Sequence, residues 1–258
     1  MGVVRVDGAR LFYHRFGHGR PLLLLHGLGS SGRDWEYQRR PLAQHFELII
    51  PDLRGHGASE RSGGYHVERF ASDCWALVDQ LGHGRIDILG HSMGGAVAMQ
   101  MALDRPDAVG RLALSNTLPS FRVDTLAKRW LLWTRLVLMG WLGPRRLSHY
   151  MSHKLYPRPD QAELRARVAR RNARNDRNVY LETVRALTRW SVRERLAELR
   201  MPVLVLGAEA DYFARRESEA FVTALPDGRL RHFPGTRHGL PLELPGPFNE
   251  AVVEFLGA

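Results

Sequence analysis

The sequence predicts an α/β protein whose mostly parallel sheet is interrupted by an all-helical insertion. Three observations indicate this. Short apolar runs that end at glycine or turn residues are typical of strands buried on both faces. These runs alternate with stretches of helical periodicity, as in a parallel sheet covered on both sides. Between residues 117 and 199 the strand pattern stops and helical periodicity dominates. We therefore expect a core of residues 1–116 and 200–258 and a helical cap at 117–199.

The first part of the chain predicts a hairpin followed by alternating strands and helices. Asp7-Gly8 separates two runs of alternating residues and is a strong signal for a tight hairpin turn. The hairpin predicts an antiparallel edge for the sheet. Further strands are expected at residues 22–25, 48–50, 86–89 and 111–116, and helices at 33–45, 66–81 and 93–103.

The cap predicts helices at residues 126–141, 161–174 and 179–190. Strands at 203–207 and 230–233, a helix that includes 221–225 and a terminal helix at 248–256 then complete the core. Because the sheet pattern resumes after the insertion, we expect the cap over the carboxyl ends of the strands, where ligands bind in such folds.

Composition and charge exclude several classes of protein. The 258 residues include one cysteine, Cys74, which excludes an internal disulfide framework and a cysteine-ligated metal site. The N-terminus lacks a signal-peptide pattern, and no apolar run is long enough to predict a membrane span. We therefore expect a soluble cytoplasmic protein. The net charge is +10, and residues 117–200 contain 19 Lys and Arg against 7 Asp and Glu, so the excess positive charge lies in the cap.

Residues 90–94 read Gly-His-Ser-Met-Gly between a predicted strand and a predicted helix. In this context the GxSxG pattern is typical of a nucleophile elbow, a sharp turn that exposes the serine hydroxyl. Ser92 is thus the candidate nucleophile. The backbone N–H of Met93 lies at a helix N-terminus and is a candidate oxyanion donor. A glycine-rich turn with an idle serine is the alternative interpretation.

A serine hydroxyl is a poor nucleophile unless a base lies beside it and a carboxylate orients that base. His238 follows the last predicted strand, at the same end of the sheet as Ser92. It is our candidate base, although His26, His56 and His91 lie near the same end.

Asp211, which follows the strand at 203–207, is the candidate acid, and Glu209 is its competitor. Asp52 also ends a strand, but we expect it to cap the turn at residues 54–59. The turn His26-Gly27-Leu28-Gly29 supplies a candidate second oxyanion donor, the amide of Leu28. No phosphate-binding glycine motif precedes a helix.

Together these motifs resemble the α/β-hydrolase superfamily, in particular its cap-bearing esterases, lactonases and C–C hydrolases. The resemblance rests on residues 26–29, 52–59, 90–95, 209–211 and His238 with 243–245, in the order and spacing of the family. It implies an α/β-hydrolase fold with Ser92 as nucleophile, His238 as base and Asp211 as acid. The amides of Leu28 and Met93 would bind the oxyanion. It further implies acyl transfer to water without a metal or organic cofactor. Serine at 92 argues against the mechanism of haloalkane dehalogenases and epoxide hydrolases, which place aspartate there.

The substrate pocket is expected beneath the cap, beside Gly27 and His91. Trp130 and Trp133 belong to a predicted cap helix that is apolar on more than one face. We expect one face of this helix to roof an acyl or aryl pocket. Packing against the core is the alternative.

Residues 165–177 contain six arginines in thirteen positions. They indicate either a solvated helical face or an anion-binding surface for an acidic acyl carrier protein, a carboxylate-bearing substrate or an anionic membrane. In its charge this cap resembles that of esterases that cut pimeloyl-carrier-protein methyl esters. Nucleic acid fits poorly, because the stretch lacks interleaved aromatic residues and any known module.

The sequence therefore predicts a hydrolase of carboxylic esters, with small-molecule esters or acyl esters presented by an acidic carrier protein as its substrates. A C–C bond hydrolase or enol-lactonase of aromatic degradation is the alternative within the superfamily. A ligand-sensing protein with vestigial hydrolase activity is the alternative from another class. The sequence does not predict an oligomeric state.

Overall fold

The computed structural model describes residues 1–257, in which eight strands form one sheet in the order β1-β2-β4-β3-β5-β6-β7-β8. The pairs β1·β2 and β2·β4 are antiparallel, and every other neighbouring pair is parallel. The mostly parallel sheet with an antiparallel edge is thus confirmed. The strands are β1 Gly2–Val6, β2 Ala9–Phe16, β3 Arg20–Leu25, β4 Phe46–Pro51, β5 Ile86–His91, β6 Val109–Ser115, β7 Val203–Ala208 and β8 Gly228–Phe233.

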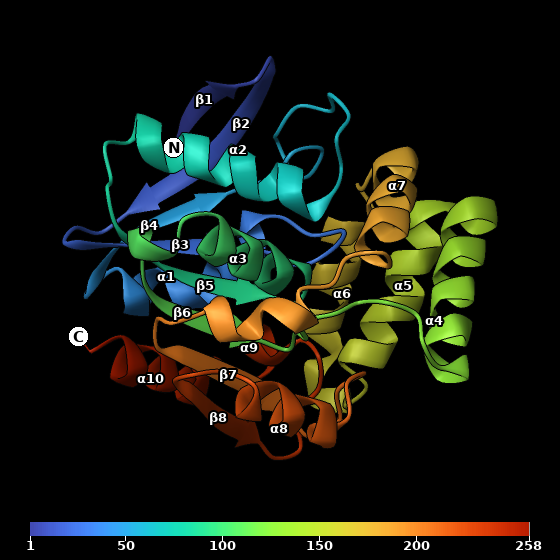
Figure 1. Ribbon diagram of the computed structural model, residues 1–258. Helices are drawn as coiled ribbons and strands as arrows, with labels where there is room; N and C mark the ends of the chain where they lie inside the picture. Colours follow the sequence, from blue (N-terminus) through green and yellow to red (C-terminus); the bar gives the residue numbers. More distant parts are fainter. Residues whose placement is uncertain (258) are drawn as a thin grey trace.

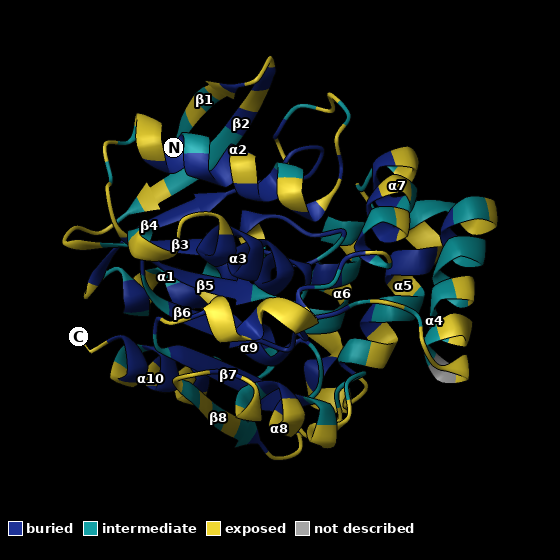
Figure 2. Ribbon diagram, viewed as in Figure 1, coloured by how far each residue is buried: buried dark blue, intermediate teal, exposed yellow. Residues whose placement is uncertain are grey.

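Helices cover both faces of this sheet (Figure 1). One apolar cluster joins the sheet to α2 (Val67–Gln80), α3 (Met93–Asp104) and α8 (Arg215–Thr223). A second joins its other face to α1 (Glu36–Leu42) and α10 (Pro245–Leu256). Strands β4 and β7 are consequently buried along their whole length, and β3, β5 and β6 along most of theirs (Figure 2). Short helical turns complete the core: η1 Gly32–Trp35, η2 Pro106–Ala108 and α9 Leu240–Glu243. A further turn, η5 Arg193–Glu198, precedes β7.

The segment between β6 and β7 is helical and lies beyond the carboxyl ends of the parallel strands (Figure 1). It contains α4 Leu126–Val137, the π-helical turn η3 Leu138–Leu142, α5 Gly143–Leu155, η4 Pro159–Gln161, α6 Ala162–Asn172 and α7 Arg177–Leu187. We keep the name cap for residues 117–199. Helix α5 was not predicted. Its buried positions are Leu147, Ser148 and Ser152, so two serines weaken the apolar periodicity that would have marked it.

Polar contacts attach the cap to the core. Arg171 of α6 pairs with Glu36 at 3.0 Å and with Asp34 at 3.4 Å. Gln161 donates a hydrogen bond of 2.8 Å to Glu243 of α9. Asn175 of the cap donates a hydrogen bond to the carbonyl oxygen of Gly29, so the cap is also attached to the loop that follows β3.

Ser92 occupies the sharp turn between β5 and α3. Its backbone has φ 53° and ψ −119°, a conformation that costs a non-glycine residue about 1–3 kcal/mol. Close packing enforces it, because a Cβ on Gly94 would lie 2.1 Å from the carbonyl oxygen of Leu25 in β3. A Cβ on Gly90 would lie 2.5 Å from the carbonyl oxygen of Gly94. Both positions therefore require glycine, because a side chain at either one would overlap neighbouring backbone atoms.

We expect Gly94→Ala to lower the free energy of unfolding by about 3 kcal/mol or more, because only a shift of α3 or β3 relieves the overlap. Gly84→Ala is the matched control. A Cβ at Gly84 meets no atom within 4 Å, and we expect a change below about 0.5 kcal/mol. Urea denaturation measures both variants, and equal stabilities would contradict the tight passage of α3 beside β3.

Candidate active site

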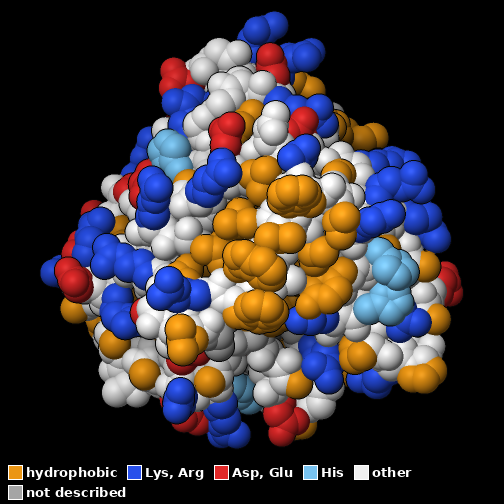
Figure 3. Space-filling model, turned by 90° about the vertical axis from the view of Figure 1, so that its right-hand side faces the viewer, with side chains coloured by type: hydrophobic (Ala, Val, Ile, Leu, Met, Phe, Trp, Pro, Cys, Tyr) orange, Lys and Arg blue, Asp and Glu red, His pale blue; other side chains and the backbone are white. Residues whose placement is uncertain are grey.

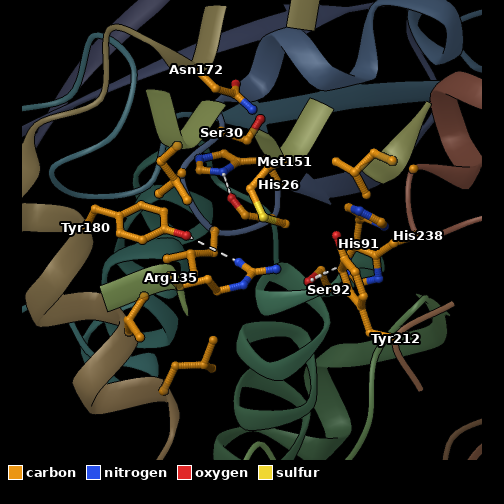
Figure 4. A pocket seen from close by; sticks show the side chains of 18 of the residues that line it. His26, Ser30, His91, Ser92, Arg135, Met151, Asn172, Tyr180, Tyr212 and His238 are labelled. Carbon is orange, nitrogen blue, oxygen red and sulfur yellow. Dashed lines mark hydrogen bonds between the residues drawn. The ribbon is translucent and has the colours of Figure 1, made fainter. Parts of the chain in front are cut away.

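Ser92, His238 and Asp211 come together where β5, β7 and β8 end. The Nε2 atom of His238 lies 2.9 Å from Ser92 Oγ (Figure 4). Its Nδ1 atom lies 2.6 Å from Asp211 Oδ1. The structure thus brings the three sequence-predicted side chains into one hydrogen-bonded row.

Asp211 is held ionised and oriented by its neighbours. Burial alone would raise the pKa of its carboxyl group, but His238 and the hydrogen bonds from Asn116 and Tyr212 outweigh burial and lower it. Asn116 Nδ2 donates to Oδ2 at 2.7 Å, and the Tyr212 amide donates to Oδ1 at 2.5 Å. The carboxylate therefore accepts the Nδ1 proton of His238, which leaves Nε2 free to accept the serine proton.

Asn116 is a site residue that the sequence analysis missed. It follows β6 with a left-handed φ of 50°, a conformation that asparagine tolerates better than most residues. A signal for this role was present in the sequence. The asparagine directly follows a buried strand, and the next strand along the chain carries the acid.

The competing carboxylates have other partners. Glu209 accepts a hydrogen bond of 2.7 Å from the Gly235 amide in the loop that carries His238. Asp52 accepts from the amides of Gly32 and Ala58 at 2.7 and 2.8 Å, so it fixes the turn after β4 as predicted. Neither contacts His238.

One candidate oxyanion donor directly follows the serine in the chain, and the other lines the same cavity. Met93 is the first residue of α3, so its N–H has no acceptor within the helix. Leu28 lies in the loop after β3 and lines the same cavity as Ser92.

His26 positions the loop that contains Leu28. Its Nδ1 lies 2.9 Å from the Gly27 carbonyl oxygen, and its Nε2 accepts from the Leu53 amide at 3.0 Å. Burial lowers the pKa of His26 to about 4. The ring is therefore neutral at pH 7, with the proton on Nδ1.

A cavity of about 210 Å³ separates the cap from these residues (Figure 4). Gly27 and His91 line it. Burial, followed by the neighbouring His238, lowers the pKa of His91 to about 3, so His91 is neutral. The cap contributes mainly apolar side chains: Leu131, Leu132, Met139, Leu147, Met151 and Leu155.

The prediction that Trp130 and Trp133 line the pocket is wrong. They are 67% and 54% exposed, stack with ring centroids 5.0 Å apart and belong to the outer face of the cap. The neighbouring Leu131, Leu132 and Arg135 face the cavity instead. Because α4 is apolar on two faces, periodicity alone did not indicate which face points inward.

The arginines of residues 165–177 divide into two groups. Arg165, Arg167 and Arg171 bond to groups of the protein itself, including the Tyr156 carbonyl oxygen and Glu36. Arg170, Arg174 and Arg177 are exposed. Part of the segment thus fastens the cap, and part faces solvent.

The serine lies at a strand-to-helix turn of a mostly parallel sheet, and the histidine and the aspartate follow later strands. This order and placement are typical of α/β hydrolases. Residues 20–245 match the family model of the alpha/beta hydrolase fold, so the chain belongs to the α/β hydrolase family.

Among its relatives, the "Putative carbamate hydrolase RutD" of Caulobacter vibrioides (strain NA1000 / CB15N) is 30% identical over 270 residues, 99% of this chain and 98% of the relative. A thermophilic esterase from Thermogutta terrifontis is 26% identical with a TM-score of 0.85, over 98% of this chain and 96% of that chain. The enol-lactonase from Burkholderia xenovorans LB400 shares the fold, with a TM-score of 0.91 and 23% identity over 100% of both chains.

His26 and His56 predict a loss of stability in acid. Both are buried, their ring centroids lie 5.3 Å apart, and burial is the main cause of pKa values of about 4 and about 3. In the unfolded chain each titrates near pH 6.5. The unfolded state therefore binds more protons as the pH falls below 6.5, and folding becomes less favourable. Between pH 7 and pH 5 we expect a loss of about 2 kcal/mol per histidine.

His56→Asn tests this, because the asparagine amide can still donate to the Arg54 carbonyl oxygen that His56 Nδ1 contacts at 3.0 Å. We expect the variant to lose about 2 kcal/mol less unfolding free energy between these pH values than the parent. Urea denaturation at both pH values provides the measurement. An unchanged loss in the variant would show that His56 is not buried in its neutral form.

Proposed function

We propose that this protein is a serine hydrolase that cleaves carboxylic esters through an acyl-enzyme on Ser92. The observation that supports it most is the row of hydrogen bonds from Ser92 Oγ through His238 to Asp211, at the floor of a mostly apolar cavity. Membership of the α/β hydrolase family and the likeness to an esterase at 26% identity agree with this reaction.

The reaction follows from the arrangement of these groups. Ser92 Oγ attacks the ester carbonyl carbon while His238 Nε2 takes the hydroxyl proton. The amides of Leu28 and Met93 stabilise the oxyanion, and loss of one such donor typically lowers the rate ~10²–10³-fold. His238 then gives the proton to the leaving alcohol.

In the second half, His238 removes a proton from water, which attacks the acyl carbonyl carbon. The bond from this carbon to Ser92 Oγ then breaks, and His238 returns the proton to Oγ, so that the acid is released and the serine hydroxyl is restored. Asn116 does not react. By holding the second oxygen of Asp211 it keeps the carboxylate aligned with the imidazole during both halves.

Carbamate hydrolysis is the second candidate, favoured by a relative that matches 99% of this chain at 30% identity. Its carbonyl would be attacked by the same serine. C–C bond cleavage or enol-lactone hydrolysis, and ligand sensing with vestigial turnover, remain the alternatives from the sequence. An acidic carrier protein also remains a prediction, and its docking surface would be the exposed Arg170, Arg174 and Arg177.

We expect Ser92→Ala to lower turnover of p-nitrophenyl butyrate at least ~10⁴-fold, because the acyl-enzyme cannot form. Ser191→Ala, which removes a hydroxyl outside the cavity, should retain turnover within about threefold. A fluorophosphonate probe should label the parent and not Ser92→Ala. Full turnover in Ser92→Ala would exclude the proposed nucleophile, and an unlabelled, inactive parent would favour ligand sensing.

Parallel assays with an alkyl carbamate and a vinylogous diketone separate the remaining reactions. Faster cleavage of either than of the ester would replace the ester as the assigned substrate class.

A further inference from the structure

Arg135 is distinguished from the other charged side chains of the cavity wall. Among residues 1–257, Asp34 in this wall pairs with Arg171, and Lys128 pairs with acidic groups at 3.0 and 3.1 Å. Arg135 has no ionic partner among residues 1–257. Its Nη1 donates to the Tyr180 hydroxyl at 3.2 Å instead.

Arg135 reaches from α4 into the cavity, between Tyr180 and the catalytic serine (Figure 4). Its guanidinium carbon lies 5.5 Å from the centroid of the Tyr212 ring. That ring in turn lies 4.6 Å from the His238 ring, so a single aromatic ring separates the guanidinium from the catalytic histidine.

The guanidinium is charged, and its surroundings leave that charge unbalanced. Burial lowers the pKa of Arg135, but the oxygens of Tyr180 and Tyr212 outweigh burial and raise it. A charge among apolar side chains is unfavourable unless an opposite charge accompanies it. Carboxylates satisfy this requirement best, because their two oxygens match the fork of guanidinium N–H groups.

We propose that Arg135 binds a carboxylate of the substrate, so that the preferred substrates are esters bearing a second, ionised carboxyl group. The ester part of this statement rests on the proposed function, whereas carboxylate binding at Arg135 does not. In the part of the cavity wall that the structure describes, Arg135 is the one cation without an acidic partner. Its single positive charge matches the single negative charge of a carboxylate.

The test compares two ester series that differ only in the terminal group. Monomethyl esters of dicarboxylic acids, from succinate to suberate, are matched with methyl esters of monocarboxylic acids of equal chain length. We expect kcat/KM to favour the best charged ester over its neutral match by about 10- to 100-fold, the range for a charge-assisted hydrogen-bonded pair.

Arg135→Met should remove this preference by lowering kcat/KM for the charged esters while changing that for the neutral esters less than about threefold. Arg135→Lys should restore part of it. Lys128→Met is the matched control, since Lys128 already has ionic partners, and it should keep the preference. Equal turnover of both series by the parent, or equal losses of both in Arg135→Met, would overturn the proposal.

A binding measurement separates this proposal from the hydrolase assignment. Calorimetry with adipate and hexanoate on Ser92→Ala requires no turnover. Adipate should bind more tightly than hexanoate, and Arg135→Met should abolish the difference. If no ester is cleaved but adipate still binds through Arg135, the proposed function fails and the carboxylate site stands. If adipate binding does not depend on Arg135, the carboxylate site fails.

A different observation concerns the outer face of the cap, where apolar side chains form a patch surrounded by Lys and Arg (Figure 3). Its members are Trp130, Trp133, Trp141, Leu126 and Leu142, which are 67%, 54%, 87%, 80% and 43% exposed. We call these five residues the tryptophan patch. So large an apolar surface indicates a binding partner.

The charge around the tryptophan patch indicates what that partner is. Residues 125–159 contain seven Lys and Arg and no Asp or Glu, and Arg129, Arg145 and Arg146 are exposed. A second copy of the chain would place one basic surface against another. An anionic lipid surface offers opposite charge together with the interfacial environment that tryptophan prefers. Because no helix of residues 1–257 is long and apolar enough to cross a membrane, contact would be with its surface.

We infer that the tryptophan patch binds anionic bilayers. The purified full chain should co-sediment with vesicles of phosphatidylcholine mixed with phosphatidylglycerol more than with phosphatidylcholine alone, and less at high salt. The triple variant Trp130→Ser, Trp133→Ser and Trp141→Ser should lose this binding, whereas Val3→Ser, at another exposed apolar position, should keep it.

Three results would overturn the inference: no vesicle binding by the parent, equal binding of neutral and anionic vesicles, or unchanged binding by the triple variant. A dimer in light scattering that the triple variant dissociates would assign the tryptophan patch to a second copy instead.

Discussion

The tight passage of α3 beside the end of β3 is the constraint on which the site depends. The contact with β3 leaves no room for a side chain at residue 94, and the backbone at Ser92 adopts a positive φ. A serine on an ordinary helix or strand would not be raised above the sheet in this way. The stability of the packed core thus compensates for the strain that presents the hydroxyl to His238.

The cap supplies a boundary for that site. The inward side of α4 combines leucines with one unbalanced guanidinium, and its outward side carries exposed tryptophans. The same helix therefore determines which substrates fit and which surfaces the protein contacts. Arg171 of α6 pairs with Asp34 and Glu36, so the cap is attached to the core near the loop that contains Leu28.

Much of the fold could be predicted from the sequence because buried parallel strands and their turns leave strong local signals. Such signals are present at the elbow at Ser92, at the hairpin turn Asp7-Gly8 and at the strand ends before Asp211 and His238. The α/β hydrolase family assignment is confirmed by the match of residues 20–245. Local patterns could not indicate α5, whose buried stripe contains serines, or the direction of the two apolar faces of α4. Nor could they indicate Asn116 and Arg135, since both act through residues distant in the chain. The catalytic roles themselves remain predictions.

Trapping the intermediate tests the central claim most directly. The parent enzyme would be mixed with p-nitrophenyl butyrate, quenched in acid within the first turnovers, digested and analysed by mass spectrometry. Our account predicts one butyryl group on the peptide that contains Ser92, and none when His238 is replaced by alanine. Release of p-nitrophenol from an enzyme whose Ser92 peptide stays unmodified throughout the reaction would contradict it.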